Sequence, residues 1–281
     1  MTENLEFTGE RFTPECVREI WYEHWHRYAF ARPLCAGKRV LDAACGEGYG
    51  SNLLAAVAAD VIGVDVSAQA IEHARSRYAD RSNLRFERID ATALPDFGTS
   101  FDRIVSFETL EHLQAQEQLV DGFAKQLGDD GILLISSPDK HTYSDVSGHK
   151  NEFHVRELYR PEFEALLAKH FPHVRIFGQK LLFQSAIWAL DECRTGHAEA
   201  WTADQAGASL SEGLAYSPLY FIAVCSRQPL PAQLSSLSLF GDGEESVYNH
   251  YNHEIRKNMA AGARIAELEA EIARLQACTT T

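Results

Sequence analysis

Long hydrophobic runs are missing from this sequence of 281 residues. Nowhere do about 18 apolar residues follow one another, which is the length that a membrane-spanning helix needs. The opening residues, MTENLEFTGERF, include acidic side chains and no apolar segment, unlike a secretory signal or a membrane anchor. We therefore expect a cytoplasmic protein without a membrane span.

Cysteine pairs are missing as well. The six cysteines are scattered along the chain, and no two of them form a CxxC pair or follow the spacing of a metal finger. This use of cysteine predicts reduced thiols, as in the cytosol, rather than a disulfide framework.

Basic side chains are in short supply. The 26 Lys and Arg residues stand against 40 Asp and Glu residues, for a formal net charge of −14 at pH 7, and they form no basic stripe. Such a surface repels polyanions over most of its area. The composition therefore argues against DNA and long RNA as partners and favours small or neutral molecules.

From Lys38 onward the chain alternates short β-branched runs with longer helical patterns. This alternation is typical of βαβ units and predicts an α/β fold around a parallel sheet. Helices are expected from Ser67, a suitable N-cap, to about Tyr78, and again between Pro161 and Pro172. Seven strands are expected, at residues 39–43, 61–65, 84–89, 101–107, 132–136, 174–177 and from 218 onward.

The pattern divides the chain into three regions. Residues 1–37 are crowded with aromatic side chains, and we expect a helical cap there that either buttresses the sheet or forms a lid over a binding site. Residues 38–228 hold the α/β domain, with an insertion at 184–217 that belongs to none of the expected strands. Residues 229–281 form a linker and a C-terminal helix.

The C-terminal helix carries a short heptad pattern. Its apolar residues follow 3-4-3 spacing, with isoleucine at the a positions and leucine at the d positions: Ile265, Leu268, Ile272 and Leu275. Arg264 at g and Glu269 at e have opposite charges. This pattern is typical of a parallel two-stranded coiled coil and hence of a homodimer. A helix that packs on its own domain, or a linker to a further module, remains an alternative.

A glycine-rich loop, CGEGYG, follows the first strand and opens a helix. Glycine is needed at Gly46 and Gly48 where a ligand approaches the backbone closely and where a tight turn requires positive φ. No Gly-Lys-Ser/Thr follows, which excludes a Walker A loop, and Ser51 stands where a nicotinamide-binding loop has its third glycine.

Acidic residues mark the first three strands. Asp65 ends the second strand and can accept hydrogen bonds from both hydroxyls of a ribose, while Asp90 ends the third and can accept from an adenine amine. Asp42 lies in the first strand, beneath the loop, where its charge suits a ligand with an ammonium and a sulfonium group better than a pyrophosphate.

In these segments the chain resembles class I S-adenosylmethionine-dependent methyltransferases over about residues 38–226. The resemblance rests on an ordered series of motifs: VLDAACGEGYG, VIGVDVS, FERIDATALP, FDRIVSFETLEHL and GILLISSPD. Ala44 departs from it, since the family usually has a glycine there. The resemblance implies a Rossmann-like sheet of seven strands with helices on both faces, and S-adenosyl-L-methionine as the cofactor.

The resemblance also implies which residues contact the cofactor. The loop would pack on the methionine part, the end of the second strand on the ribose, the end of the third strand on the adenine, and an arginine before the first strand on the cofactor carboxylate. These contacts fall on Arg27, Asp42, Ala44, Gly46, Gly48, Asp65, Val66, Asp90, Ala91, Phe107 and Glu108.

An acceptor would meet the residues just after the fourth strand, because ligands of open α/β sheets bind at the carboxyl ends of the strands. There lie Glu111 and His112, and the later segment HKNEFHVREL brings His154 to the same end. Methyl transfer to an alcohol requires removal of a proton, and histidine is the usual base at neutral pH. We expect His112 to be this base, although it could serve only to order the loop.

The whole chain more closely resembles a bacterial group of methyltransferases associated with polysaccharide and lipopolysaccharide (O-antigen) biosynthesis. The resemblance rests on TGERF at 8–12, YEHWHRYAFA at 22–31, SFETLEHL at 106–113 and EFHVREL at 152–158. It implies that the acceptor is a hydroxyl of a sugar or surface glycan.

Two other functions stay open. Glu108, Glu111, His112 and His154 resemble the Mg²⁺ or Mn²⁺ site of methyltransferases that modify the 2′-hydroxyl at RNA 3′ ends, although the net acidity counts against RNA. Such a metal would also suit a sugar diol. Alternatively, the protein is a non-catalytic scaffold that binds S-adenosylmethionine, against which the intact acidic residues argue.

Overall fold

A computed structural model describes residues 19–187, 199–203, 209–232 and 234–279. The chain divides into two compact units, one ending at Leu239 and the other beginning at Phe240. The TGERF motif lies outside the described residues, as does part of the predicted insertion. The predicted region boundaries at residues 37 and 228 stay predictions.

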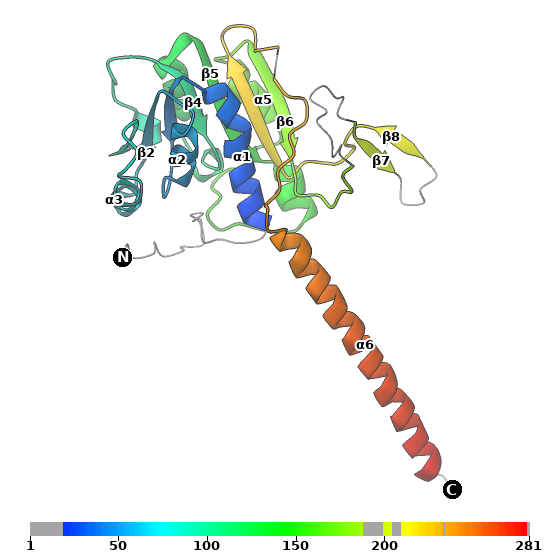
Figure 1. Ribbon diagram of the computed structural model, residues 1–281. Helices are drawn as coiled ribbons and strands as arrows, with labels where there is room; N and C mark the ends of the chain where they lie inside the picture. The colour runs from blue at the N-terminus through cyan, green and yellow to red at the C-terminus, as the bar shows by residue number, and fades with distance from the viewer. Residues whose placement is uncertain (1–18, 188–198, 204–208, 233, 280–281) are drawn as a thin grey trace. The chain divides into compact units, whose positions relative to one another are not determined.

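The first unit is built around a seven-stranded sheet with the order β3-β2-β1-β4-β5-β9-β6 (Figure 1). All seven predicted strands are present and only their ends differ: β1 (Arg39–Ala43), β2 (Asp60–Asp65), β3 (Leu84–Arg88), β4 (Phe101–Ser106), β5 (Leu127–Pro138), β6 (His173–Gln179) and β9 (Tyr220–Ser226). This is the Rossmann-like methyltransferase fold that the sequence predicts.

The sheet is mixed, which corrects the expectation of a parallel sheet. Strand β9 lies between β5 and β6 and runs antiparallel to both. Gln179, at the end of β6, pairs with Tyr220, at the start of β9, so the chain re-enters the sheet at the edge where it left. A parallel strand would need a crossover to the opposite edge. The intervening segment includes a small hairpin, β7 (Trp201–Ala203) and β8 (Leu210–Glu212), which the sequence did not predict.

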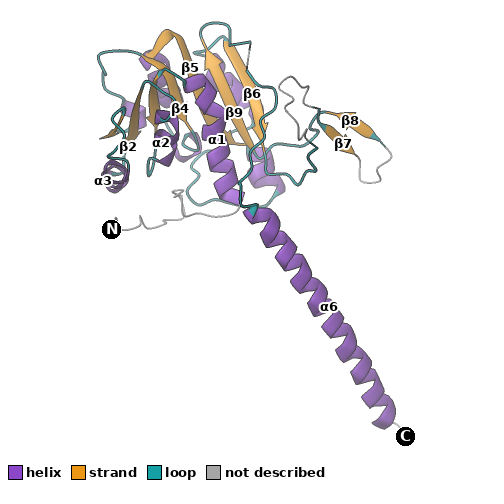
Figure 2. Ribbon diagram, viewed as in Figure 1, coloured by secondary structure: helices purple, strands orange, loops and turns teal. Residues whose placement is uncertain are grey.

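Helices cover both faces of the sheet (Figure 2). Neighbouring strand residues point to opposite faces, so Leu41 belongs to one apolar cluster and Val40 to the other. The helices of the first unit are α1 (Glu19–Cys35), α2 (Tyr49–Ala55), α3 (Ala68–Arg77), α4 (Gln116–Gln126) and α5 (Arg160–Ala168). Ser67 caps α3 as predicted, because its side chain accepts a hydrogen bond from the amide of Ala70.

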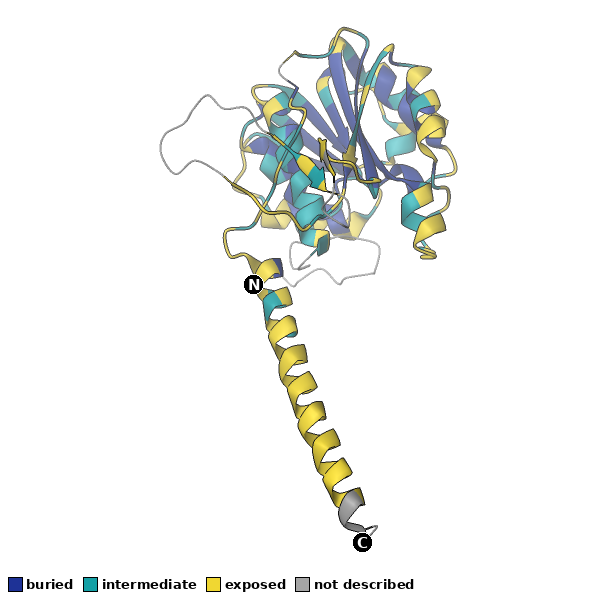
Figure 3. Ribbon diagram, turned by 90° about the vertical axis from the view of Figure 1, so that its right-hand side faces the viewer, coloured by how far each residue is buried: buried dark blue, intermediate teal, exposed yellow. Residues whose placement is uncertain are grey.

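Helix α1 packs on the sheet as a buttress. Its residues Tyr28, Ala31 and Cys35 are buried, and Trp21 and Trp25 pack against the same apolar cluster. The strands form the buried layer in Figure 3, and the exposed residues lie on the outer helices and loops. A role for this region as a lid stays a prediction.

The second unit contains the predicted C-terminal helix, α6 (Ser246–Thr279). It has 34 residues and is exposed along most of its described length. In the part of the chain that the structure describes, none of the helices combines the length and apolar character needed to cross a bilayer.

Candidate active site

The glycine-rich loop turns sharply between β1 and α2. Three of its residues have a left-handed backbone: Ala44 (φ 61°), Gly46 (φ 56°) and Gly48 (φ 89°). A Cβ atom at Gly48 would also lie 2.7 Å from the ring of Phe86, so only glycine fits there. At Ala44 the left-handed backbone costs roughly 1–2 kcal/mol more than for glycine, which explains why a glycine is expected at this position.

Asp65 joins the loop to the end of β2. One carboxylate oxygen, Oδ2, accepts a hydrogen bond from the amide of Gly46 at 2.9 Å, and the other, Oδ1, accepts from the amide of Ser67 at 2.8 Å. The side chain remains partly exposed, so each oxygen retains a lone pair for a ligand. The next residue, Val66, is 63% exposed at the same edge.

Asp42 lies beneath the loop, as the sequence predicts, but it has no exposed surface. Its carboxylate accepts hydrogen bonds from Ser51 Oγ at 2.6 Å and from the Tyr28 hydroxyl at 3.1 Å. Burial raises its pKa to about 7, against the lowering effect of these two donors. Asp42 therefore joins α1 to α2 beneath the loop and has no surface exposed to a ligand.

The third strand ends at the same edge. Asp90 is exposed, and its Oδ1 atom accepts hydrogen bonds from the amide of Thr92 at 2.8 Å and from its hydroxyl at 2.7 Å. This contact caps the short 3₁₀ helix η1 (Ala91–Ala93) and leaves Oδ2 without a bond among those described. Because β3, β2, β1 and β4 are neighbours in the sheet, their carboxyl ends form one continuous row.

Arg27 is a buried cation aimed at this edge. It is 1% exposed, donates from Nε to Gln179 Oε1 at 2.8 Å and lies 4.4 Å from the ring centre of Tyr220. Burial alone would lower its pKa, yet Glu108, Tyr220 and other neighbours raise it, so the guanidinium stays charged. Its Nη1 and Nη2 atoms are buried and donate no hydrogen bond to any residue that the structure describes. This arrangement fits the carboxylate of a ligand.

Glu108 closes the row after β4. Its carboxylate lies 3.4 Å from Arg27 Nη2 and accepts a hydrogen bond from Ser136 Oγ at 2.7 Å. Ser136 in turn accepts from the amide of Glu108, whose backbone is left-handed with φ 51°. A non-glycine residue held in this way costs about 1–3 kcal/mol, and such strain gathers at functional sites. The preceding residue, Phe107, is buried against Tyr28.

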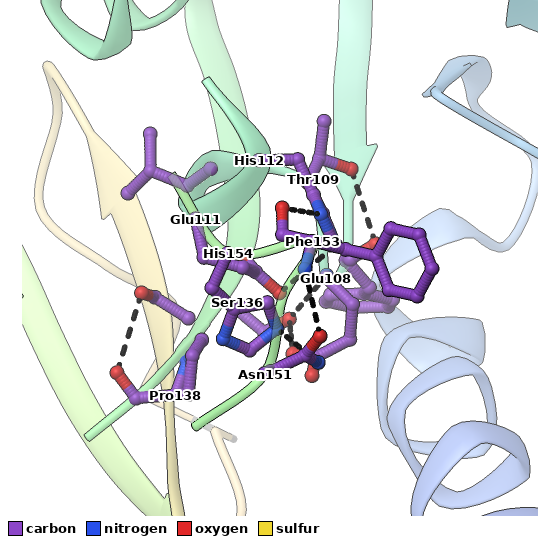
Figure 4. Close-up of polar contacts among 12 residues, drawn as sticks. Glu108, Thr109, Glu111, His112, Ser136, Pro138, Asn151, Phe153 and His154 are labelled. Carbon is purple, nitrogen blue, oxygen red and sulfur yellow. Dashed lines mark hydrogen bonds and ion pairs between the residues drawn. The ribbon is translucent and has the colours of Figure 1, made fainter. Parts of the chain in front are cut away.

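A second polar group follows immediately, on the 3₁₀ helix η2 (Leu110–His112) (Figure 4). Glu111, His112 and His154 each offer one nitrogen or oxygen atom within 4.8 Å of the other two. The structure thus brings together three of the four predicted ligands. The fourth, Glu108, contacts Arg27 and Ser136, and its charge acts on Glu111 and His154.

The ring of His112 is held in a defined tautomer. Its Nδ1 atom lies 3.0 Å from the backbone oxygen of Phe153. A carbonyl oxygen can only accept, so Nδ1 carries the hydrogen and, in the neutral ring, Nε2 carries the lone pair. This Nε2 atom lies 3.8 Å from Glu111 Oε1, inside the cluster.

Glu111 is 1% exposed, and neither of its carboxylate oxygens has a hydrogen-bond partner among the described residues. Burial raises its pKa well above the ordinary value, and the charge of Glu108 raises it further. A buried carboxyl group in this state is either protonated or neutralised by a cation.

His154 is fixed on three sides. Its Nδ1 atom lies 2.6 Å from Glu157 Oε1, and its ring stacks on Tyr143 with the centres 5.2 Å apart. Burial is the largest influence on its pKa, which is lowered despite the nearby Glu157. Asn151 Nδ2 lies 3.0 Å from the remaining nitrogen, Nε2.

Several residues of the site were absent from the sequence prediction. Their positions depend on contacts between distant segments, as with Gln179 against Arg27, Ser136 against Glu108 and Ser144 against Glu157. Glu157 alone had a local signal, because it lies three residues after His154 within the EFHVREL motif.

Comparison with known sequences shows the family to which the chain belongs. Residues 34–176 match the sequence model of a family described as a methyltransferase domain. A protein of Mycobacterium tuberculosis described as a probable S-adenosylmethionine-dependent methyltransferase is 39% identical over 166 residues, which cover 58% of this chain and 60% of the relative. The chain thus spans about three fifths of this relative. A ubiquinone biosynthesis O-methyltransferase of Psychrobacter arcticus is 34% identical over 114 residues, or 39% of this chain and 44% of the relative.

Solved structures share the fold. The YcgJ protein of Bacillus subtilis aligns with a TM-score of 0.51 and 21% identity, covering 73% of this chain and all of that one. A Haloferax volcanii methyltransferase solved with the Trm112 methyltransferase activator aligns with a TM-score of 0.54 and 18% identity, covering 76% of this chain and 91% of that one. At these identities the match shows the fold alone.

The buried carboxyl of Asp42 predicts a pH-dependent stability. Because its folded pKa of about 7 exceeds its ordinary value of 3.8, the native state binds more protons than the unfolded state between these values. The free energy of unfolding therefore falls as pH rises through this window. Asp42→Asn keeps an acceptor oxygen and a donor but cannot ionise. Between about pH 5 and pH 8 its free energy of unfolding should fall by about 1–3 kcal/mol less than that of the wild type.

Urea unfolding at the two pH values measures this difference. Glu23, whose pKa is also raised to about 7, titrates in both proteins and so cancels from the comparison. Asp102→Asn, at an exposed aspartate, is the matched control. Parallel stability profiles for wild type and Asp42→Asn would contradict the assignment.

Proposed function

The chain belongs to the family of class I S-adenosylmethionine-dependent methyltransferases, and from that premise we propose that it methylates a hydroxyl group of a sugar or surface glycan. The observation that supports an oxygen atom as the methyl acceptor is the cluster of Glu111, His112 and His154. An oxygen nucleophile must lose a proton, and this cluster offers the groups for that task. Support for a glycan comes from the EFHVREL and SFETLEHL motifs and from the acidic composition.

The row of strand ends would hold the cofactor. When bound, S-adenosylmethionine supplies a methyl group on a positively charged sulfur. Arg27 would donate hydrogen bonds from its two Nη groups to the cofactor carboxylate, with Nη2 also paired with Glu108, and Asp65 would accept from the ribose hydroxyls. The adenine would lie beside Asp90 and Ala91, and Gly46 and Gly48 would let the methionine part approach the backbone.

The other residues of the proposed cofactor site lie along the same row of strand ends, apart from Asp42, which would act from beneath the loop: Ala44, Val66, Phe107 and Glu108.

The cofactor site is tested by substitution of Asp65. Asp65→Ala removes two charge-assisted hydrogen bonds to the ribose, each worth about 1.5–3 kcal/mol, and should weaken binding of S-adenosylhomocysteine at least about tenfold. Calorimetry measures the affinity, with NAD as a negative control. Asp60→Ala, at the opposite end of the same strand, should bind as the wild type does. Tight NAD binding without any response to S-adenosylhomocysteine would refute the proposed site.

A divalent cation explains the acceptor cluster better than a free base. A histidine that binds a metal through one ring nitrogen usually donates a hydrogen bond from the other nitrogen to a carbonyl or carboxylate. His112 donates in this way to the backbone oxygen of Phe153, and His154 donates to Glu157. The buried, unpartnered carboxylate of Glu111 would be neutralised by the same cation. Imidazole ligands favour Mn²⁺ over Mg²⁺, which prefers oxygen atoms. The cation would lower the pKa of a bound sugar hydroxyl.

Metal chelation distinguishes the two proposed roles of His112, which are metal ligand and general base. With a cation, EDTA should abolish methyl transfer to a glycan acceptor, Mn²⁺ should restore it, and His154→Ala should be as damaging as His112→Ala. With His112 as a free base, EDTA should have no effect, while His112→Ala should lower the rate by about 10² to 10⁴ with cofactor affinity unchanged. Full activity of His112→Ala, with or without EDTA, would refute both roles.

The same cluster supports a second candidate function, metal-dependent 2′-O-methylation of an RNA 3′ end, since a terminal ribose offers the same diol as a sugar. The formal net charge of −14 disfavours that substrate. A non-catalytic scaffold fits least, because a scaffold has no need of an orphaned buried carboxylate beside two oriented histidines. A screen of glycans, nucleotide-sugars and short RNAs with labelled cofactor distinguishes these functions.

Helix α6 would pair with a second copy of the chain as a parallel coiled coil. Its a and d side chains are about half exposed, with 46% to 56% of their surface accessible: Ile265, Leu268, Ile272 and Leu275. Across a parallel pair, Arg264 at g and Glu269 at e would attract each other.

Light scattering tests the proposed dimer. The full chain should have twice the monomer mass, and Ile272→Asp should shift it toward the monomer because a charge would enter the apolar seam. Ala270→Asp places the same charge at the outer f position of the same helix and should leave the mass unchanged. Equal masses for the two variants would show that α6 has another role.

A further inference from the structure

Glu157 forms a shielded hydrogen bond with His154, one of the three residues of the acceptor cluster. Glu157 Oε1 lies 2.6 Å from His154 Nδ1, and the two side chains are only 9% and 7% exposed. A contact this short and this shielded from water orients the imidazole ring far more strongly than a surface pair would.

The carboxylate of Glu157 is itself held in place. Its second oxygen, Oε2, accepts a hydrogen bond from Ser144 Oγ at 2.5 Å. Ser144 lies in the π-helix η3 (His141–Val146), a rare element that often occurs at functional sites. The preceding residue, Tyr143, stacks on the ring of His154. Ser144 and Tyr143 therefore fix both members of this hydrogen-bonded pair from the same short helix.

The pair decides which nitrogen of His154 faces the cluster. A carboxylate only accepts hydrogen bonds, so Nδ1 carries the hydrogen and Nε2 carries the lone pair. Asn151 agrees with this tautomer, because its side-chain Oδ1 accepts from the amide of Phe153 and its Nδ2 group can therefore donate to His154 Nε2 (Figure 4). His112, whose ring centre lies 5.1 Å from that of His154, presents Nε2 in the same way.

We propose that Glu157 is a positioning residue that holds His154 in the tautomer whose Nε2 atom binds a divalent cation, which would replace the hydrogen bond from Asn151. Its charge also makes the ring a stronger electron donor. The role in cation binding rests on the proposed function, whereas the choice of tautomer does not. No contact between Glu157 and the acceptor is required, and removal of its carboxylate should act entirely through His154.

Two substitutions of Glu157 test this role by removing first its charge and then its hydrogen-bond acceptor. Glu157→Gln keeps an acceptor for Nδ1 without the charge, so it should keep the tautomer and weaken Mn²⁺ binding about threefold to tenfold. Glu157→Leu removes the acceptor, so it should lose the tautomer and weaken Mn²⁺ binding about 10-fold to 100-fold. Glu164→Gln makes the same chemical change at an exposed pair on α5 and serves as the control.

Two measurements report the effect without turnover. Long-range ¹H–¹⁵N correlation on histidine-labelled protein reads the tautomer of His154, with His154→Gln to assign its signals, and electron paramagnetic resonance gives the affinity for Mn²⁺. S-adenosylhomocysteine affinity and thermal unfolding check that each variant folds. If Glu157→Leu fails to fold, Glu157→Gln decides, and Mn²⁺ affinity equal to that of the wild type would overturn the proposal.

Measurement of the His154 tautomer distinguishes a failure of this inference from a failure of the proposed function. A wild type that binds no Mn²⁺ but shows His154 with hydrogen on Nδ1, lost in Glu157→Leu, would refute the cation and retain the positioning role. Mn²⁺ binding that depends on His154 but is unchanged in both Glu157 variants would refute the positioning role and retain the cation. Retention of the tautomer in Glu157→Leu would also overturn the inference.

Discussion

The active edge depends on one buried cation, the guanidinium of Arg27. A charge with 1% of its surface exposed costs several kcal/mol unless its surroundings are arranged to compensate. The compensating groups come from segments far apart in the sequence: Glu108 after β4, Gln179 at the end of β6 and Tyr220 at the start of β9. Arg27 therefore fixes α1 to the sheet and brings three strand ends to a common point.

Glu108 stands at the border between two chemically distinct halves of this edge. On one side, the glycine-rich loop, Asp65 and Asp90 present backbone and carboxylate groups suited to a nucleoside. On the other side, histidine rings converge with the buried carboxyl of Glu111. The left-handed backbone of Glu108 makes the chain change direction here, so that its own carboxylate faces Arg27 while the next residues turn toward the histidines.

The sequence predicted the parts of the molecule in which local pattern and position agree. Asp65 and the loop glycines could be placed because strand ends of neighbouring parallel strands necessarily meet, and Ser67 could be placed because a helix cap depends on adjacent residues. The direction of β9 could not be predicted, because an apolar strand reads the same for either orientation. The contacts of Glu108 with Arg27 and Ser136 could not be predicted, because they join distant segments and depend on a left-handed backbone that no spacing in the sequence reveals.

The reversed direction of β9 has a consequence for how such a protein changes over time. Because Gln179 and Tyr220 pair with each other at the active edge, the stretch between them leaves and rejoins the sheet at one place. Its length and composition can therefore vary without a shift in the register of any strand. A different stretch at this position would therefore leave the strand pairing, and the contacts of Gln179 and Tyr220 with Arg27, in place.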